Sequence, residues 1–347
     1  MRRHTSLSLW LFIAIILFLW VLAGWNTYNF DYDNYSARYR YVQSGGFNLL
    51  KLDFGYDFIE YIFILFGSSF EQFRIWIYGM GLFIIGIIIW KWSIHPVWVL
   101  FFYICTHYLR DVVETRNFLA SIFILLTIFH YGRKKPAKYL LIALLIFCAF
   151  SIHMSFFLYI PFLMADIRKW NYWALMLVSV LLSLFARELL SNSVGLFELD
   201  GMDDKVSEFL TLSPTFAFIA AVVKIVVNGM TISYFHSKAL KACNQEFFLK
   251  KMPLANYSQI MYNLNSLSCI LLILTPISGS FYTRLFGNIL LLNAIYFFNV
   301  IGSLKRGRTE LIVILLLYTV FFTVMTQINP FWEHLNFVLS NNALLFN

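Results

Sequence analysis

The sequence is poor in charged residues: Asp, Glu, Lys and Arg make up 13% of its 347 residues, against about 25% in a typical soluble domain. So few charges cannot cover a water-exposed surface on a chain of this length. Hydrophobic residues make up 60% and aromatic residues 20%. We therefore expect the lipid bilayer to be the solvent, and residues 1–347 to form a single integral membrane domain.

Cysteine and the common catalytic motifs are also scarce. Three of the four cysteines, Cys105, Cys148 and Cys269, lie in apolar runs, and Cys243 lies in a basic segment. Their spacing does not fit a disulfide framework, a zinc site or a nucleophile. There is no Gly-rich phosphate loop, HExxH or GxSxG, and the Asp31-Tyr32-Asp33 triplet is of a kind common by chance. We expect no metal and no cofactor.

Apolar runs long enough to cross a bilayer, about 20 residues each, recur from Leu7 almost to the end of the chain. They predict an all-α, polytopic transmembrane bundle of about eleven spans, within a range of about ten to twelve. The expected spans are 7–23, 72–90, 95–109, 116–131, 138–152, 154–166, 172–190, 215–235, 257–275, 282–301 and 310–326. Phe58–Phe66 is too short to span and contains Glu60, which favours a re-entrant or interfacial helix.

Loop charges set the expected orientation. With the basic start of the chain in the cytoplasm, sixteen basic residues fall inside and eight outside, as the positive-inside rule requires. The external loops are then 24–57 and 191–214, and 236–256 is a cytoplasmic loop. The net charge of +8 is spread over these short loops, so we do not expect nucleic-acid binding.

The first external loop interleaves carboxylates, arginines and tyrosines between Asn29 and Tyr41. Carboxylates and arginines hydrogen-bond sugar hydroxyls, and aromatic faces pack on sugar rings. The alternative is an aromatic belt at the membrane surface, where Tyr is ordinarily enriched. The candidate substrate-binding residues of this loop are Asp31, Asp33, Tyr35, Arg38 and Arg40.

Arginines at two further external positions could bind a diphosphate. Arg116 opens a helix after the charged segment 109–117, which also contains Arg110, and Arg284 is expected at the same depth. A guanidinium fork offers paired donors to phosphate oxygens and neutralises the charge of a leaving diphosphate. Snorkelling to the membrane surface is the alternative.

Two buried ionisable residues complete the candidates. His153 lies where two short apolar segments meet, at Ser151–Ser155, and is expected to line a cavity and act as a general base. A satisfied structural histidine is the alternative. Lys224 lies near the middle of a span, where a charge is functional by default or is paired with another helix.

Three pieces of the sequence together resemble a known family. They are Asp31-Tyr32-Asp33-Asn34-Tyr35 with Gly55-Tyr56-Asp57-Phe58, Arg116-Asn117-Phe118-Leu119-Ala120, and Phe150-Ser151-Ile152-His153-Met154-Ser155. With them the chain resembles the EpsG-like, Wzy-type polymerases of bacterial surface polysaccharides. It departs from the family in having Gly55–Phe58 at a Glu-Pro-Gly-Phe-like element and Ile152 before the histidine.

The resemblance implies a GT-C-like fold and a glycosyltransferase in the bacterial inner (cytoplasmic) membrane, with a cytoplasmic N-terminus. It would join oligosaccharide repeat units carried on undecaprenyl pyrophosphate at the outer face. Its partners would be the lipid-linked oligosaccharide, membrane lipids and a regulator of chain length. The implied roles are diphosphate binding by Arg116 and Arg284, general base catalysis by His153 or an acid near it, and substrate binding by the 31–40 segment with Asp57, Glu60 and Arg110.

Two other classes of membrane protein remain open. A flippase or transporter would also be polytopic with buried charge, but should show internal repeats, and we find no convincing repeat. A ligase or another lipid-linked glycosyltransferase uses the same donor and leaving group. The sequence alone does not separate such an enzyme from a polymerase.

Overall fold

The computed structural model describes residues 6–49, 54–128, 130–131, 137–167, 169–193, 214–241, 246–247, 252–275, 279–304 and 307–345. Side chains are described in these ranges except at 186–193, 214–217, 246–247, 252, 274, 279–281, 283–284 and 326–337. The chain divides into two compact units, which are described separately below. The first comprises 1–160, 248–250 and 327–347, and the second comprises 161–247 and 251–326.

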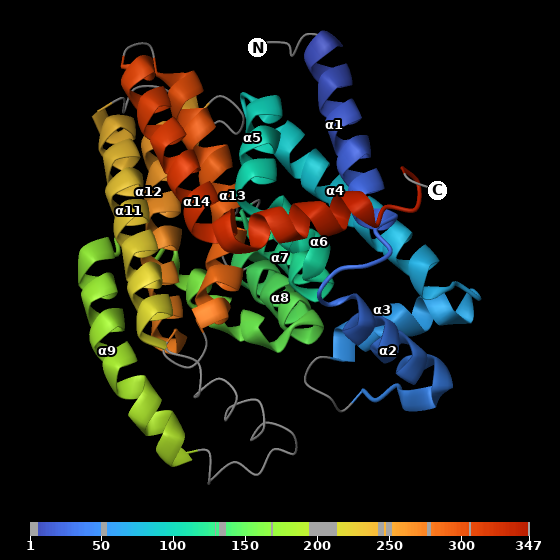
Figure 1. The fold of residues 1–347 in the computed structure, drawn as a ribbon. Coiled ribbons are helices and arrows are strands. Elements are labelled where there is room, and N and C mark those ends of the chain that lie inside the picture. Colours follow the sequence, from blue (N-terminus) through green and yellow to red (C-terminus); the bar gives the residue numbers. More distant parts are fainter. Residues whose placement is uncertain are drawn as a thin grey trace. The chain divides into compact units, whose positions relative to one another are not determined.

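The described part of the chain is almost entirely helical, as predicted (Figure 1). The helices that begin before residue 153 are α1 (Ser6–Gly24), α2 (Tyr32–Tyr41), η1 (Val42–Gly46), α3 (Phe54–Leu65), α4 (Phe70–Trp92), α5 (Pro96–Tyr103), η2 (Ile104–Tyr108), α6 (Leu109–Val113), α7 (Thr115–Thr127) and α8 (Ala137–Ile152). The later elements are η3 (Met154–Met164), α9 (Tyr172–Ser193), α11 (Pro214–Lys241), β1 (Glu246–Phe247), β2 (Met252–Pro253), α12 (Leu254–Ser268), η5 (Cys269–Leu274), α13 (Gly279–Ser303) and α14 (Arg308–Ser340). The strands β1 and β2 form one short antiparallel pair.

Each of the eleven apolar segments expected to span coincides with helical structure. Five stretches in the described residues are long and apolar enough to cross a membrane: 6–24, 70–92, 218–241, 285–303 and 308–325. Four shorter apolar helices fall at 115–127, 137–152, 154–164 and 172–185. The chain is therefore a multi-pass membrane protein.

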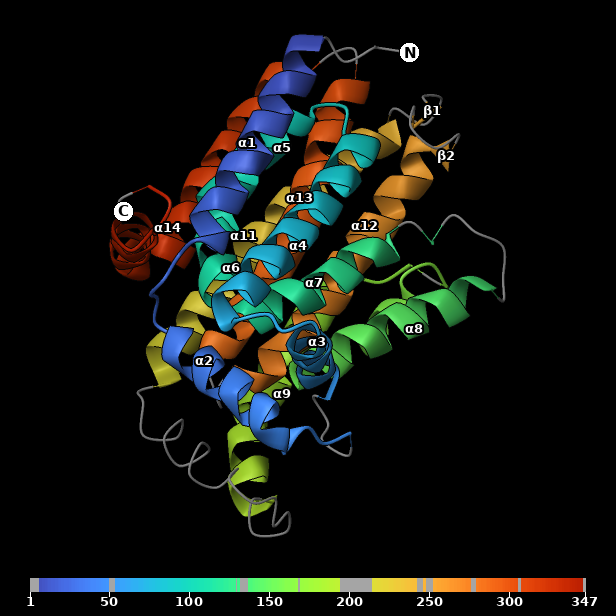
Figure 2. The ribbon, with the colours of Figure 1, turned by 90° about the vertical axis from the view of Figure 1, so that its right-hand side faces the viewer.

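The segment expected as the first external loop contains the helix α2, and α3 coincides with the short helix expected at Phe58–Phe66; the two helices lie side by side in both views (Figure 1, Figure 2). Asp33 lies in the first turn of α2, and Arg38 and Arg40 lie in its last turn, so the charges complement the helix dipole. Tyr39 anchors α2 by packing on the rings of Phe70 and Phe73. Aromatic packing thus converts a polar segment into ordered structure.

Close helix contacts build the first unit around α4. The Trp20 indole donates a 2.8 Å hydrogen bond to the Ile75 carbonyl, which ties α1 to α4. On another face of α4, a Cβ atom at Gly81 would lie 2.4 Å from the Phe118 ring of α7. The residue between these helices must therefore be glycine, because a side chain there would push α7 away.

A buried asparagine network joins helices of the second unit. Asn228, Asn265 and Asn293 come from α11, α12 and α13, and all three are fully buried. Asn293 Nδ2 donates to the side-chain oxygens of Asn228 and Asn265 at 3.0 and 2.9 Å. Tyr318 of α14 adds a 2.8 Å hydrogen bond to Asn228. Side-chain amides of this kind hold membrane helices together.

Candidate functional site

An ion pair between α2 and α3 forms one side of the candidate site in the first unit. Arg38 donates from Nε to Asp57 Oδ1 at 2.6 Å, and its Nη2 lies 2.5 Å from the same oxygen. The Asp57 side chain is 1% exposed, while that of Arg38 is 22% exposed. The Arg38 guanidinium also lies over the Tyr56 ring, 5.3 Å from its centre. Two residues predicted to bind substrate are therefore in direct contact.

Glu60 follows one turn later on α3 and is fully buried. Among the described residues, neither of its carboxyl oxygens accepts a hydrogen bond of normal geometry, although the Tyr56 hydroxyl, four residues earlier, is close enough to lower the pKa of Glu60 as a donor. Burial raises the pKa of Glu60 to about 8, with Asp57 raising it further and Arg38 and Arg116 opposing this. The 12 residues of α3 are too few to span a bilayer.

Unmet hydrogen bonds of this kind are costly, at about 1–3 kcal/mol for each buried polar group. Native structures therefore keep few of them, and a buried group without a partner calls for a functional explanation. Here a carboxyl and a phenol four residues apart on the same helix interact without a hydrogen bond of normal geometry, and no other described residue bonds to either. The arrangement suits a ligand hydroxyl, which can both donate and accept.

Arg116 reaches the same cluster from the first turn of α7. Its backbone N–H is directed at the Tyr35 hydroxyl at 3.5 Å, and the Tyr35 ring lies 5.9 Å from that of Tyr56. The positive charge of Arg116 lowers the pKa of Tyr35, Tyr56 and Glu60, although burial raises all three overall. The structure thus brings together Tyr35, Arg38, Asp57, Glu60 and Arg116.

His153 lies at the predicted break, between the end of α8 and the start of η3. Its Nδ1 accepts from the Ser155 backbone N–H at 3.4 Å and lies 2.9 Å from the Ser155 hydroxyl. Close by, α3 packs on α8, where a Cβ atom at Gly55 would lie 2.5 Å from Ser151 Oγ. Gly55 therefore lets α3 approach the end of α8 two residues before His153.

Other predicted residues lie at the edge of the cluster, apart from it, or outside the described side chains. Asp33 and Arg40 are exposed on α2, and no contact joins them to the cluster in the described part of the chain. Asp31 precedes α2 and adjoins the cluster: its carbonyl accepts from the Tyr35 N–H at 3.0 Å, and its charge raises the pKa of Tyr35. The Arg284 side chain, on α13 of the second unit, lies outside the described residues. Their proposed roles stay predictions.

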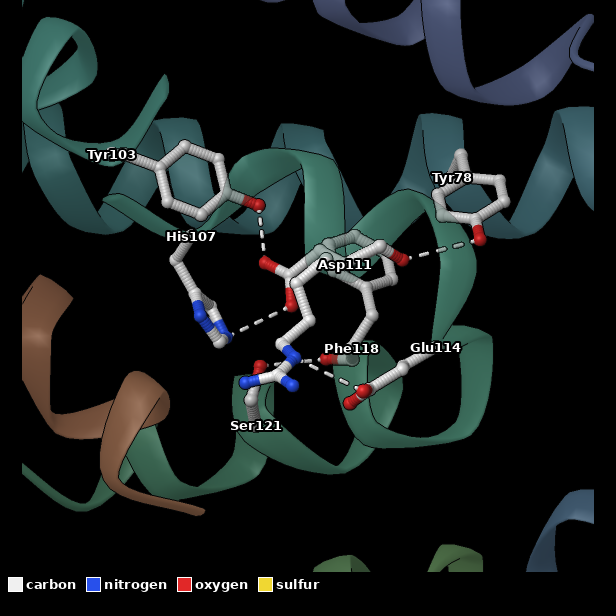
Figure 3. A network of polar contacts seen from close by, with 8 residues as sticks. Tyr78, Tyr103, His107, Asp111, Glu114, Phe118 and Ser121 are labelled. Atoms are coloured by element: carbon white, nitrogen blue, oxygen red, sulfur yellow. Dashed lines mark hydrogen bonds and ion pairs between the residues drawn. The ribbon is translucent and has the colours of Figure 1, made fainter. Parts of the chain in front are cut away.

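A second buried network, which the sequence alone did not reveal, joins residues of α5, η2 and α6 with Glu114, which lies between α6 and α7 (Figure 3). Arg110 Nε lies 3.1 Å from Glu114 Oε1. His107 Nε2 lies 3.2 Å from one oxygen of Asp111, and the Tyr103 hydroxyl donates to the other at 2.6 Å. The signal in the sequence was the i,i+4 spacing of both charged pairs, which places each pair on one helix face.

Lys224, the charge expected within a span, lies on α11 and is 4% exposed. It is not an isolated charge there. Among the described residues, no group of three or more His, Cys, Asp or Glu side chains is placed to hold a metal ion.

A family model described as the EpsG family matches residues 9–336 of the chain. No curated protein and no solved structure matches the chain. The matched region runs from α1 into α14. It includes every residue of the candidate cluster around Glu60 and of the network around Arg110.

Proposed function

The chain belongs to the EpsG family, as its motifs predicted, and we propose that it is a polymerase that joins oligosaccharide repeat units carried on undecaprenyl pyrophosphate. The proposed location is the bacterial inner membrane, with the N-terminus in the cytoplasm, about eleven crossings and a GT-C-like arrangement. The site acts at the outer face. A lipid-linked oligosaccharide is the substrate, and a regulator of chain length is a proposed partner.

The cluster of Arg38, Asp57, Glu60 and Arg116 is the observation that carries this proposal. Two carboxyl groups and two guanidinium groups meet among tyrosine rings, on segments that loop charges place outside. Carboxyl groups and tyrosines suit a glycan, and arginines suit a diphosphate. The chemistry of the cluster thus matches both halves of a lipid-linked sugar.

The proposed reaction is glycosyl transfer. A hydroxyl of one repeat unit attacks the anomeric carbon of the growing chain, and the bond from that carbon to the diphosphate oxygen breaks. Arg116 and Arg284 neutralise the charge that develops on the diphosphate. His153 or an acid near it takes the hydroxyl proton.

Substrate recognition is proposed for the polar residues around this centre. The Arg38–Asp57 pair holds both side chains in fixed orientations, which lowers the entropic cost of binding a sugar at this place. The proposed substrate-binding set is Asp31, Asp33, Tyr35, Arg38, Arg40, Asp57, Glu60 and Arg110.

Purified protein in lipid nanodiscs, supplied with a synthetic lipid-diphosphate-linked repeat unit, tests the proposal. We expect a ladder of polymer lengths, with one lipid diphosphate released for each bond formed. Arg116→Ala should remove the ladder and Arg116→Lys should retain part of it, since lysine keeps the charge but loses the fork. Wild-type protein that releases no lipid diphosphate would contradict the proposal.

Deletion of the gene separates the polymerase from its rivals. Cells without a polymerase should display single repeat units. Loss of all surface glycan, with repeat units trapped inside, would indicate an export protein instead. A ligase would be indicated if polymer still forms on its lipid carrier but does not reach its final acceptor.

A further inference from the structure

We propose that Glu60 is the residue that takes the proton from the attacking sugar hydroxyl, and that His153 serves as a hydrogen-bond donor. This inference rests on the proposed function and names the base within it. It follows from the hydrogen bonding of the two residues and from the charges around Glu60.

The carboxyl of Glu60 is prepared to receive a hydroxyl. It is fully buried, and neither of its oxygens has a hydrogen-bond partner among the described residues. The Tyr56 hydroxyl, four residues earlier on α3, likewise makes no hydrogen bond of normal geometry, although it is close enough to Glu60 to lower the pKa of that carboxyl. A sugar hydroxyl between them would donate to Glu60 and accept from Tyr56, and so would satisfy both buried groups.

Charged and titratable groups face Glu60 from three helices. Arg38 and Tyr39 belong to α2, Tyr56 and Asp57 to α3, and Arg116 to α7. Burial dominates, and the pKa of Glu60 is about 8. A general base is most effective when its pKa lies near the working pH. Glu60 therefore binds its proton more tightly than an ordinary carboxylate does, yet still ionises under physiological conditions.

His153 lacks the free lone pair that a base requires. The Ser155 backbone N–H can only donate, and it points at His153 Nδ1. A neutral imidazole has one donor and one acceptor nitrogen, so Nδ1 is the acceptor and Nε2 carries the hydrogen. In this tautomer His153 is a hydrogen-bond donor at Nε2 and cannot accept a proton there.

The step balances without a further reactant. The O–H bond of the acceptor sugar breaks, and its proton passes to the ionised carboxyl of Glu60. The acceptor oxygen forms a bond to the anomeric carbon, and the bond from that carbon to the diphosphate breaks. The electron pair of that bond leaves with the lipid diphosphate, and Glu60 loses its proton to solvent before the next cycle.

Glu60→Gln tests the assignment, because glutamine keeps the size of the side chain and removes its basicity. With the lipid-linked repeat unit in nanodiscs, we expect a decrease in bond formation of about 100-fold or more, with unchanged binding of the donor. Glu60→Asp should retain part of the rate. Glu310→Gln is the matched control, because Glu310 is a half-exposed member of a surface pair with Lys238. It should polymerise like the wild type.

Variants of His153 provide the second test. His153→Gln retains a side-chain donor and His153→Ala does not, so the glutamine variant should be the more active, and both should keep the pH at which wild-type activity rises. If His153 were the base, both variants would lose that rise.

The possible results separate this inference from the proposed function. Full activity of Glu60→Gln while the wild type polymerises would overturn the role of Glu60 alone. Absence of lipid diphosphate release by the wild type would overturn the proposed function itself. If Glu60→Gln does not fold, Glu60→Asp is the deciding variant. A rate and pH dependence identical to those of the wild type would overturn the role of Glu60. A lower rate would support it.

Discussion

Arg38 directs two of its nitrogens, Nε and Nη2, at a single oxygen of Asp57. The pair locks α2 against α3 within one turn of Glu60. Each partner also acts on Glu60 through its charge: Asp57 raises the pKa of Glu60 and Arg38 lowers it. The ion pair therefore does more than join two helices, because its two members set the protonation of Glu60 in opposite directions.

Replacing either member should move the pH dependence of polymerisation. In the wild type, activity should rise with pH to about 8, where Glu60 ionises. Asp57→Asn removes the negative charge that raises the pKa of Glu60, so the midpoint of the rise should move to lower pH. Arg38→Gln removes a charge that lowers this pKa, so the midpoint should move to higher pH. Rates measured from about pH 5 to 10, spanning that pKa, check both shifts, and shifts in the same direction would contradict the role of Glu60.

Glu60 should also make stability depend on pH. Its pKa is raised from 4.5 to about 8 on folding, so the folded state holds its proton more tightly than the unfolded state does. The resulting stabilisation is complete below about pH 4.5 and is lost as pH rises through about 8. We expect Tm in detergent to fall across this window more steeply for the wild type than for Glu60→Gln. Equal slopes would show that Glu60 is not held in its protonated form.

Helix positions were largely predictable from the sequence because bilayer thickness fixes the length of an apolar run. The break at His153 was predicted for the same reason, since neither flanking segment is long enough for a full crossing. The helix α2 was not predicted, because its ten residues are mostly polar and its order depends on packing against Phe70 and Phe73. Contacts of this kind between distant segments leave no local pattern in the sequence.

The candidate site was predictable by residue type more than by arrangement. Arg38, Asp57, Glu60 and Arg116 were all candidates, yet nothing in their spacing showed that Arg38 pairs with Asp57. Glu60 was assigned to substrate binding, because burial and missing hydrogen bonds are properties of the folded chain. His107 was given no role, although its partner Asp111 lies four residues away. The i,i+4 rule would have found that pair.

The asparagine network should stabilise the second unit. Asn293→Ala removes donors to Asn228 and Asn265, which leaves buried acceptors unmet. We expect a loss of about 1–3 kcal/mol in the free energy of unfolding, seen as a lower Tm in detergent. Asn34→Ala is the control, since Asn34 is exposed and makes only a weak contact. Equal Tm values for the two variants would show that the network contributes little.

The proposed orientation predicts which loops an impermeant thiol reagent can reach. Ser44 is exposed in η1, on the side expected to face outward, and Lys241 is exposed at the end of α11, on the side expected to face the cytoplasm. In a background without the four native cysteines, Ser44→Cys should react in intact spheroplasts, because no membrane separates it from the reagent. Lys241→Cys should react only after the membrane is permeabilised. The reverse pattern would place the Arg38 to Arg116 cluster in the cytoplasm, where a polymerase acting at the outer face of the membrane could not use it.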